Sequence, residues 1–416
     1  MADKKIYLCL AHMGGKELSF IQEAFDTNWV VPLGPNVNGF EKDLEAFCGV
    51  PKRVVALSSG TAAVHLSLVK CGVGPGDEVC VQSFTFCASS HPVTYLGATP
   101  VFIDSEKDTW NMDPDLLEEA IRDRIARTGK KPKAIMPVAL YGMPYKIDRI
   151  MEIADRYGIP VVEDATEGFG SKYNGRILGT FGKYGIWSFN GNKMITTSGG
   201  GALITENEDE WKETLMYATQ YREGYPYYQH EKIGYNYRMS NICAGIGRGQ
   251  MIILDDHIAH HRHVQKLYEE LLKDVPGIHV HTQPATGEYD SNFWLSAITV
   301  NPEVRIKGQE YAYKTVVKDA VGGAPGVIHV VQNPVTDCQP NDNVEALRVF
   351  MDEAGIEARP VWKPMHKQPV YQNAPAYVNG VSEAVFKVGM CLPTGPCVTD
   401  EDVRYIVETI KNAIEQ

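Results

Sequence analysis

Short apolar runs alternate with helical patterns between about residues 52 and 205. The runs are rich in β-branched residues and contain few polar positions, which is typical of strands buried on both faces of a parallel sheet. A helical pattern at 62–69 follows the first of them. The runs predicted as strands are 53–57, 78–82, 99–104, 134–138, 159–164, 186–189 and 201–205. The pattern therefore predicts an α/β fold with a mostly parallel sheet.

The pattern changes near residue 255. A stretch rich in histidine and charge at 255–273 predicts a helix, and strands, a polar segment and further α+β patterns follow it. A chain of 416 residues exceeds the size at which one hydrophobic core stops growing. We therefore expect a large domain at 1–255 and a smaller C-terminal α+β domain at 256–416.

Composition and charge narrow the class of protein. The chain carries a net charge of −12 and has no basic tract, so it gives no support to nucleic-acid binding. It has no run of about 18 apolar residues, so no membrane span is predicted. Its N-terminal residues lack the apolar core of a signal peptide, and we expect a cytosolic protein. The nine cysteines are scattered without a C-x-x-C pair, which favours reduced and mostly buried thiols.

Candidate chemistry lies at the carboxyl ends of the predicted strands, where parallel sheets bind their ligands. Ser59-Gly60-Thr61 separates a strand from a helix, so its backbone could hold a phosphate, although a plain helix cap explains it as well. Asp164 closes another strand. It could cap a helix, contact a ribose, bind Mg²⁺ or pair with a pyridinium nitrogen. Lys193 lies in a loop rich in Gly and Asn between two more strands.

Together these residues make the set that pyridoxal 5′-phosphate (PLP) requires. The cofactor needs a lysine for a Schiff base, a carboxylate that keeps its ring nitrogen protonated, and donors for its phosphate. An aromatic face commonly covers the ring, and Phe86 is placed to supply one, although a Phe after a strand is more often part of the core. The residues by themselves favour a PLP enzyme.

Several ordered motifs make the chain similar, over essentially its whole length, to the DegT–DnrJ–StrS family of PLP-dependent sugar-nucleotide aminotransferases. These motifs lie at 32–34, 58–61, 83–86, 162–165, 179–182, 188–193 and 234–240. The resemblance implies PLP fold type I, with a seven-stranded large-domain sheet. Residues 190–201 and 359–366 resemble the 4-aminotransferases that make UDP-4-amino sugars of the bacillosamine route.

The resemblance also implies roles for single residues. Lys193 would hold PLP and then shuttle a proton. Asp164 would pair with the pyridine nitrogen, and Phe86 would stack on the ring. Asn236 would reach the cofactor phosphate of a partner subunit, which makes a homodimer with shared active sites part of the expectation. The phosphate ligands within the subunit would be Gly60, Thr61 and Ser188.

Two features depart from the family pattern. Glu167 stands three residues after the aspartate, where most members carry Gln near the 3-hydroxyl of the cofactor. A carboxylate beside that phenolate is costly unless it is protonated or faces a substrate group, so we interpret Glu167 as a mark of substrate class. The segment at about 301–345 is longer than in similar proteins, and we expect a surface insertion there.

Three further signals concern ligands. Arg359 and His366, in a polar C-terminal loop, are candidates for contact with the nucleotide diphosphate or the donor carboxylate. A cluster of histidines offers a pair with metal-ligand spacing. It has no evident third ligand, so we expect no metal and interpret it as a solvated helix face. Its members are His257, His260, His261 and His263.

The expected reaction is a ping-pong transamination. L-Glutamate would donate its amino group to PLP, and C4 of a UDP-2-acetamido-4-keto-6-deoxyhexose would receive it, giving a UDP-4-amino sugar for glycan biosynthesis. Lys193 argues against the dehydratases of the family, which lack this lysine. The alternatives are a dTDP- or 3-keto-sugar aminotransferase and, from another class, a PLP-fold protein with a binding or regulatory role and no catalysis.

Overall fold

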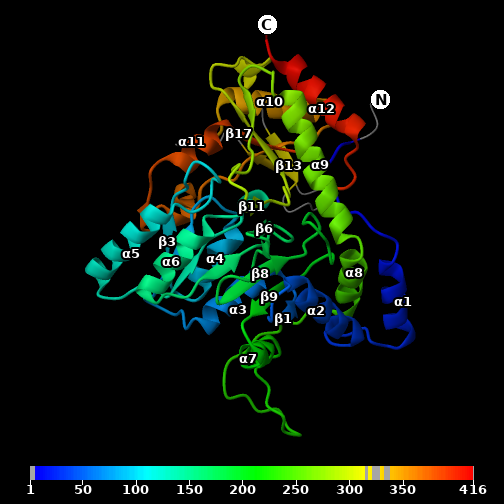
Figure 1. The fold of residues 1–416 in the computed structure, drawn as a ribbon, viewed down its shortest axis with the longest axis vertical. Helices are drawn as coiled ribbons and strands as arrows, with labels where there is room; N and C mark the ends of the chain where they lie inside the picture. Colours follow the sequence, from blue (N-terminus) through cyan, green and yellow to red (C-terminus); the bar gives the residue numbers. More distant parts are fainter. Residues whose placement is uncertain (1–4, 314–316, 321–327, 332–337, 416) are drawn as a thin grey trace.

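A computed structural model describes residues 5–313, 317–320, 328–331 and 338–415 of the chain (Figure 1). All seven predicted strands form, several of them one to three residues shorter than the apolar run. They are β1 (Arg53–Leu57), β2 (Glu78–Gln82), β3 (Thr99–Ile103), β4 (Ala134–Met136), β5 (Val162–Asp164), β8 (Tyr184–Ser188) and β9 (Gly201–Thr205).

These strands form one mixed sheet in the order β3-β2-β4-β5-β8-β9-β1. Isolated parallel bridges, Ile135 to Val161 and Val138 to Asp164, connect the β4 and β5 halves. Only β9 among the seven runs antiparallel to its neighbours. A short strand from the C-terminal part, β16 (Ala376–Tyr377), pairs with β3 in parallel and extends the sheet. The mostly parallel seven-stranded sheet is therefore confirmed, with one strand added at its edge.

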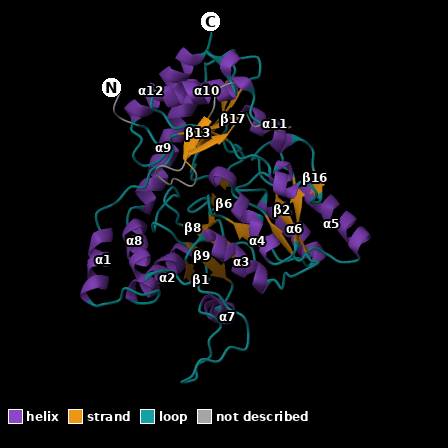
Figure 2. Cartoon of the chain, turned by 180° about the vertical axis from the view of Figure 1, so that it is seen from behind, coloured by secondary structure: helices purple, strands orange, loops and turns teal. Residues whose placement is uncertain are grey.

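Both faces of the sheet are buried, as the unbroken apolar runs require. In β1, Val54 and Ala56 belong to one hydrophobic cluster, which includes residues of α2, α5 and α6, whereas Val55 and Leu57 belong to another, which includes α3. Helices lie on both sides of the strands in Figures 1 and 2. The helices up to residue 251 are α1 (Glu17–Asp26), α2 (Pro35–Cys48), α3 (Gly60–Lys70), α4 (His91–Tyr95), α5 (Pro114–Thr128), α6 (Ile147–Tyr157), α7 (Glu208–Ala218) and α8 (Asn241–Met251).

The C-terminal part forms a second layer of sheet and helix around its own core. Its antiparallel sheet has the order β10-β12-β17-β15, and a separate hydrophobic cluster joins this sheet to three helices. The elements are α9 (Leu254–Leu272), β10 (Ile278–Val280), β12 (Ser296–Val300), α10 (Asp342–Glu353), β15 (Arg359–Pro360), α11 (Val381–Val388), β17 (Gly389–Leu392) and α12 (Asp400–Ala413).

Helix α9 contacts both cores. Its first turns place Leu254 and Ile258 in the large core, and its later turns place Val264 and Tyr268 in the C-terminal core. The predicted helix at 255–273 is thus confirmed almost residue for residue, whereas the domain boundary at 255 stays a prediction. Part of the predicted insertion at 301–345 lies outside the described residues.

Small elements complete the described chain. A three-stranded ribbon contains β6 (Lys172–Tyr173), β7 (Arg176–Ile177) and β11 (Tyr289–Asp290), and a hairpin pairs β13 (Val317–Ala320) with β14 (Ile328–Val331). Single 3-10 turns are η1 (Cys87–Ser89), η2 (Leu140–Gly142), η3 (Gln309–Tyr311), η5 (Met365–Lys367) and η6 (Pro369–Tyr371). Within the described residues, every helix is too short or too polar to span a bilayer.

Candidate active site

A cavity of about 390 Å³ opens at the carboxyl ends of the parallel strands. It brings together residues from five separate stretches of the chain between positions 58 and 200, and two tryptophans from further on. The predicted site residues that line it are Gly60, Thr61, Phe86, Asp164, Glu167, Ser188 and Lys193. The sheet thus brings motifs that are far apart in the sequence together in one site.

The start of α3 forms the part of the cavity that suits an anion. Ser59 caps this helix, because its hydroxyl accepts the N–H of Ala62 at 3.0 Å. The N–H groups of Gly60 and Thr61 belong to the first turn and have no partner within the helix. Close packing requires glycine nearby: a Cβ on Gly201 would lie 2.4 Å from the backbone nitrogen of Gly60. This helix start can therefore bind a phosphate through N–H groups and the helix dipole.

Asp164 lies at the end of β5 and is almost fully buried. Its Oδ2 accepts the hydroxyl of Ser89 at 2.6 Å, and its Oδ1 accepts the N–H of Thr166 at 3.2 Å. Ser89 in turn contacts the hydroxyl of Thr85 at 2.8 Å. These bonds fix the orientation of the carboxylate at the cavity wall.

Lys193 occupies the loop between β8 and β9 and extends into the cavity. Its side chain is 13% exposed. Its Nζ lies 3.8 Å from Oε1 of Glu167 and 4.1 Å from the ring centroid of Trp294. The amine is therefore held between a carboxylate and an aromatic face.

Glu167 is a buried carboxylate with a defined set of partners. Its Oε2 accepts the backbone N–H of Tyr141 at 2.7 Å, and its Oε1 lies 3.3 Å from the indole N–H of Trp362. Burial raises the pKa of Glu167, while the positive charge of Lys193 opposes that shift. Glu167, which departs from the Gln expected at this position, thus places a carboxylate 3.8 Å from the Lys193 amine.

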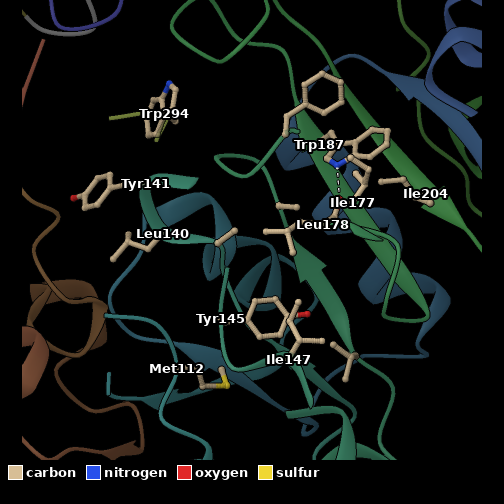
Figure 3. Packing of buried hydrophobic residues seen from close by; sticks show 14 of the residues in the cluster. Met112, Leu140, Tyr141, Tyr145, Ile147, Ile177, Leu178, Trp187, Ile204 and Trp294 are labelled. Atoms are coloured by element: carbon tan, nitrogen blue, oxygen red, sulfur yellow. Dashed lines mark hydrogen bonds between the residues drawn. The ribbon is translucent and has the colours of Figure 1, made fainter. Parts of the chain in front are cut away.

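Aromatic side chains form the remaining walls. Phe86 is 48% exposed, and its ring centroid lies 5.3 Å from that of Trp362. The ring centroid of Tyr141 lies 6.5 Å from that of Trp294 (Figure 3) and 6.2 Å from that of Trp362, at interplanar angles of 24° and 25°. An open aromatic face remains at Phe86, whereas Tyr141 is buried.

Four residues that line or support this site were not predicted from the sequence. Two of them lie in or near a motif, and two do not. Trp362 lies inside the motif at 359–366, and Ser89 follows the motif at 83–86 by three residues, so both were within reach of a prediction from the sequence. Asn292 and Trp294 belong to no motif. Trp294 reaches the site by donating from its indole to the carbonyl of Asn192 at 2.7 Å.

Three predicted residues lie outside the cavity. Asn236 is exposed beyond α7, and its predicted role in a partner subunit stays a prediction. Arg359 is exposed and pairs with Glu357. His366 is half-buried, contacts the hydroxyl of Ser83 at 2.6 Å, and has its pKa lowered by burial. The substrate contacts predicted for Arg359 and His366 also stay predictions.

The interpretation of the α9 histidines as a solvated face is wrong for two of them. His257 and His261 are buried, because α9 packs against both cores. His257 contacts His12 at 3.1 Å and donates to the carbonyl of Met194 at 3.0 Å. Among the described residues, no three metal-binding side chains gather at one point. Five of the nine cysteines are buried.

Comparisons with known proteins agree with this geometry. The sequence matches the DegT/DnrJ/EryC1/StrS aminotransferase family over residues 12–322 and 309–411. It is 42% identical to EpsN of Bacillus subtilis, named as a pyridoxal phosphate-dependent aminotransferase, over 98% of this chain and 95% of that protein. It is 34% identical to GDP-perosamine synthase of Caulobacter vibrioides, over 99% and 98%. The sugar aminotransferase Spr1654 of Streptococcus pneumoniae, solved in its PMP form, superposes with a TM-score of 0.82 at 25% identity, covering 99% and 98% of the chains.

The fold and the site define a PLP-dependent aminotransferase of fold type I. The chain belongs to the DegT/DnrJ/EryC1/StrS aminotransferase family, and it is a sugar aminotransferase. Its substrates are accordingly a nucleotide sugar and an amino donor.

Proposed function

We propose that this enzyme moves the amino group of L-glutamate to C4 of a UDP-2-acetamido-4-keto-6-deoxyhexose, giving a UDP-4-amino sugar for glycan biosynthesis. The observation that carries the proposal is the position of the Lys193 amine. It lies in one cavity with the buried carboxylate of Asp164 and the anion-binding start of α3. The motifs at 190–201 and 359–366 support the choice of a UDP-linked 4-keto sugar.

The donor set of the cavity fits PLP. Gly60, Thr61 and Ser188 would hold the phosphate, since α3 offers unpartnered N–H groups beside a serine hydroxyl. Asp164 would keep the ring nitrogen protonated, because Ser89 and Thr166 orient its carboxylate. Phe86 would cover one face of the ring. When bound, the cofactor supplies an electron sink for the reacting carbon.

In this proposal, Lys193 is the residue that transfers protons. Its amine would take a proton from the glutamate carbon that bears the transferred nitrogen and would return it to the cofactor carbon bonded to the same nitrogen. Its loop restricts the amine, because the backbone N–H of Lys193 donates to the carbonyl of Asn190 at 3.0 Å. Trp294 and Trp362 line the cavity and keep much of this region away from water.

A homodimer with shared active sites is part of the proposal. The segment after α7 extends away from the rest of the chain in Figures 1 and 2. It exposes Tyr227, Tyr228 and Ile233, which are 63%, 76% and 85% exposed. The chain returns from it at Asn236, which forms an antiparallel β-bridge with Thr219. Such a surface suits burial against a second copy. Asn236 would then reach the partner's cofactor phosphate. The cytosolic location stays a prediction.

A GDP-linked keto sugar is the second candidate acceptor. It is favoured by the identity of 34% with a protein named GDP-perosamine synthase, which extends over nearly the full length of both chains. The nucleotide is therefore the part of the proposal that most needs a direct test.

The test is a panel assay. PLP-loaded protein and glutamate are incubated with 4-keto and 3-keto sugars linked to UDP, GDP or dTDP, and amino sugars are detected by mass. We expect product from the UDP-linked 4-keto-6-deoxy sugar with the highest kcat/KM. Preference for the GDP-linked sugar would show that the nucleotide is GDP and not UDP. Turnover of 3-keto sugars alone would overturn the C4 assignment. A failure to convert glutamate to 2-oxoglutarate in the half-reaction would favour a protein without catalysis.

A further inference from the structure

The amine of Lys193 contacts two groups that both attract a positive charge. Glu167 Oε1 lies 3.8 Å from Nζ, and the face of the Trp294 indole lies 4.1 Å from it. Glu167 is 3% exposed, so water screens this ion pair weakly. A cation over a tryptophan face gains further electrostatic attraction when it is desolvated.

One buried side chain fixes both of these groups. The Oδ1 of Asn292 accepts the backbone N–H of Trp294 at 2.9 Å. Its Nδ2 donates to the backbone carbonyls of Glu167 at 3.0 Å and Phe169 at 2.9 Å. Asn292 therefore ties the strand-end segment that carries Glu167 to the distant segment that carries Trp294. The carboxylate itself is held from the other side by Tyr141 and Trp362.

The other titratable groups that act on the contact between Lys193 and Glu167 are one carboxylate, one tyrosine hydroxyl and two thiols. Asp164 is the second carboxylate that acts on Glu167. The Tyr141 hydroxyl and the thiols of Cys9 and Cys391 also interact with Glu167 or Lys193, but burial raises the pKa of each, so all three stay neutral near neutral pH. Lys193 is thus the cation that Glu167 faces.

We propose that Glu167 and Trp294 form a binding site for the free ammonium group of Lys193, and that Asn292 is the positioning residue that assembles it. This inference rests on the proposed function, in which Lys193 leaves the cofactor during each half-reaction. Between taking a proton from one carbon and giving it to the next, the amine carries a positive charge. Glu167 and Trp294 stabilise that charge at the place where the proton must be delivered.

The experiment measures the reactivity of the free amine directly. Loading the protein with pyridoxamine phosphate leaves Lys193 unbonded, and a trace amount of acetic anhydride then labels neutral amines. Mass spectrometry gives the labelling of Lys193 relative to the exposed Lys273 in the same sample. The variants are Glu167→Gln, which keeps the shape of the side chain, and Glu167→Asp, which keeps its charge. Glu119→Gln on the exposed face of α5 is the matched control.

We expect Glu167→Gln to raise the relative labelling of Lys193 at least about tenfold at fixed pH, because a weakly screened ion pair of this length is worth more than about one pH unit in the amine's protonation. Glu167→Asp should restore part of the protection, and Glu119→Gln should match the wild type. Asn292→Ala should also raise the labelling. Thermal midpoints and retained cofactor absorbance show that each variant is folded.

Equal relative labelling of Lys193 in the wild type and Glu167→Gln, within about twofold, would overturn the inference. This assay uses no keto sugar. If Lys193 labels as expected while no keto sugar is aminated, the proposed acceptor is wrong and the inference remains. If an amino sugar forms but the labelling is unchanged, the proposed function remains and the inference fails.

Discussion

Ser89 donates a hydrogen bond of 2.6 Å to Oδ2 of Asp164 and thereby orients the carboxylate at the end of β5. Both side chains are nearly fully buried, and Thr85 continues the chain of hydroxyl contacts behind Ser89 at 2.8 Å. A hydrogen bond between a neutral donor and a buried charge contributes about 1.5–3 kcal/mol. Under the proposed function, in which Asp164 pairs with the cofactor nitrogen, Ser89 is therefore the residue that positions this carboxylate.

Replacing Ser89 by alanine should weaken PLP binding. Without the hydroxyl, the Asp164 carboxylate keeps only the N–H of Thr166 as a hydrogen-bond donor among the described residues, and its orientation relaxes. We expect the dissociation constant for PLP to rise about tenfold, which corresponds to about 1.4 kcal/mol. Quenching of tryptophan fluorescence by added PLP measures it.

The control for this variant is Ser67→Ala. Ser67 is also buried and also donates its hydroxyl, to the carbonyl of Val64 at 2.7 Å, but it does not line the cavity. Unchanged PLP affinity in Ser89→Ala, or an equal loss in Ser67→Ala, would show that the Ser89–Asp164 bond does not orient the carboxylate.

Replacing Lys193 by alanine should abolish the covalent link and slow the half-reaction. Lys193, in the loop between β8 and β9, is the lysine that lines this cavity, so its amine is the group there that can form a Schiff base with the aldehyde of PLP. Loss of a general acid–base group costs about 10²–10⁴-fold in rate. Borohydride reduction followed by mass spectrometry should find PLP on residue 193 in the wild type and in Lys212→Ala, an exposed variant on α7. Reduction onto any other lysine of the wild type would disprove the assignment.

Local signals explain which parts of the fold and the site were predictable. The strands were predictable because short β-branched apolar runs with few polar positions, alternating with helical patterns, are typical of strands buried on both faces of a parallel sheet. Gly60, Asp164 and Lys193 were found because each lies at a strand end or in a strand-connecting loop, and parallel strands bring such positions to one edge. The family motifs then joined these positions into one site.

Long-range packing explains what was not predictable. Trp294 lines the cavity and Asn292 is buried beside it, and both lie about 100 residues beyond Lys193. Their roles depend on hydrogen bonds to Asn192 and Glu167 that no local pattern encodes. The α9 histidines were misread for a related reason. A polar helix face is expected to be solvated, but α9 lies against two cores, so His257 and His261 are buried by neighbours far away in the sequence.

Gly142 should be intolerant of any side chain, because its φ is +93° and an added Cβ would lie 1.8 Å from Oδ1 of Asn292. Gly142→Ala would displace the amide that ties Glu167 to Trp294. We expect an apparent loss of more than about 3 kcal/mol in the free energy of unfolding, since overpacking adds to the left-handed backbone strain. Urea denaturation of the protein measures it.

Gly129→Ala separates the two contributions. Gly129 has a φ of +69°, and an added Cβ there would meet no atom within 4 Å. This variant should therefore show only the backbone cost, about 1–2 kcal/mol. Equal losses in the two variants would mean that Asn292 moves away from residue 142 without penalty, and that its amide does not hold the site together.

Buried histidines should make the protein less stable in mild acid. Burial lowers the pKa of His261 to about 3 and that of His281 to about 4. The unfolded chain, in which a histidine titrates near pH 6.5, binds these protons first, so stability falls as the pH drops below about 6.5 and continues to fall toward the folded pKa. Each such histidine costs about 2 kcal/mol between pH 7.5 and pH 5.

The variant that isolates this effect is His261→Gln. His261 donates from Nδ1 to the carbonyl of Phe293 at 3.2 Å, and glutamine retains a donor there. Burial raises the pKa of Glu163 and Glu167, which acts in the opposite direction, so the comparison must be between variant and parent. We expect the loss of stability between pH 7.5 and pH 5 to be about 2 kcal/mol smaller in His261→Gln. His279→Gln, on the exposed side of β10, should lose as much as the parent, and the same loss in His261→Gln would mean that His261 is not the residue that resists protonation.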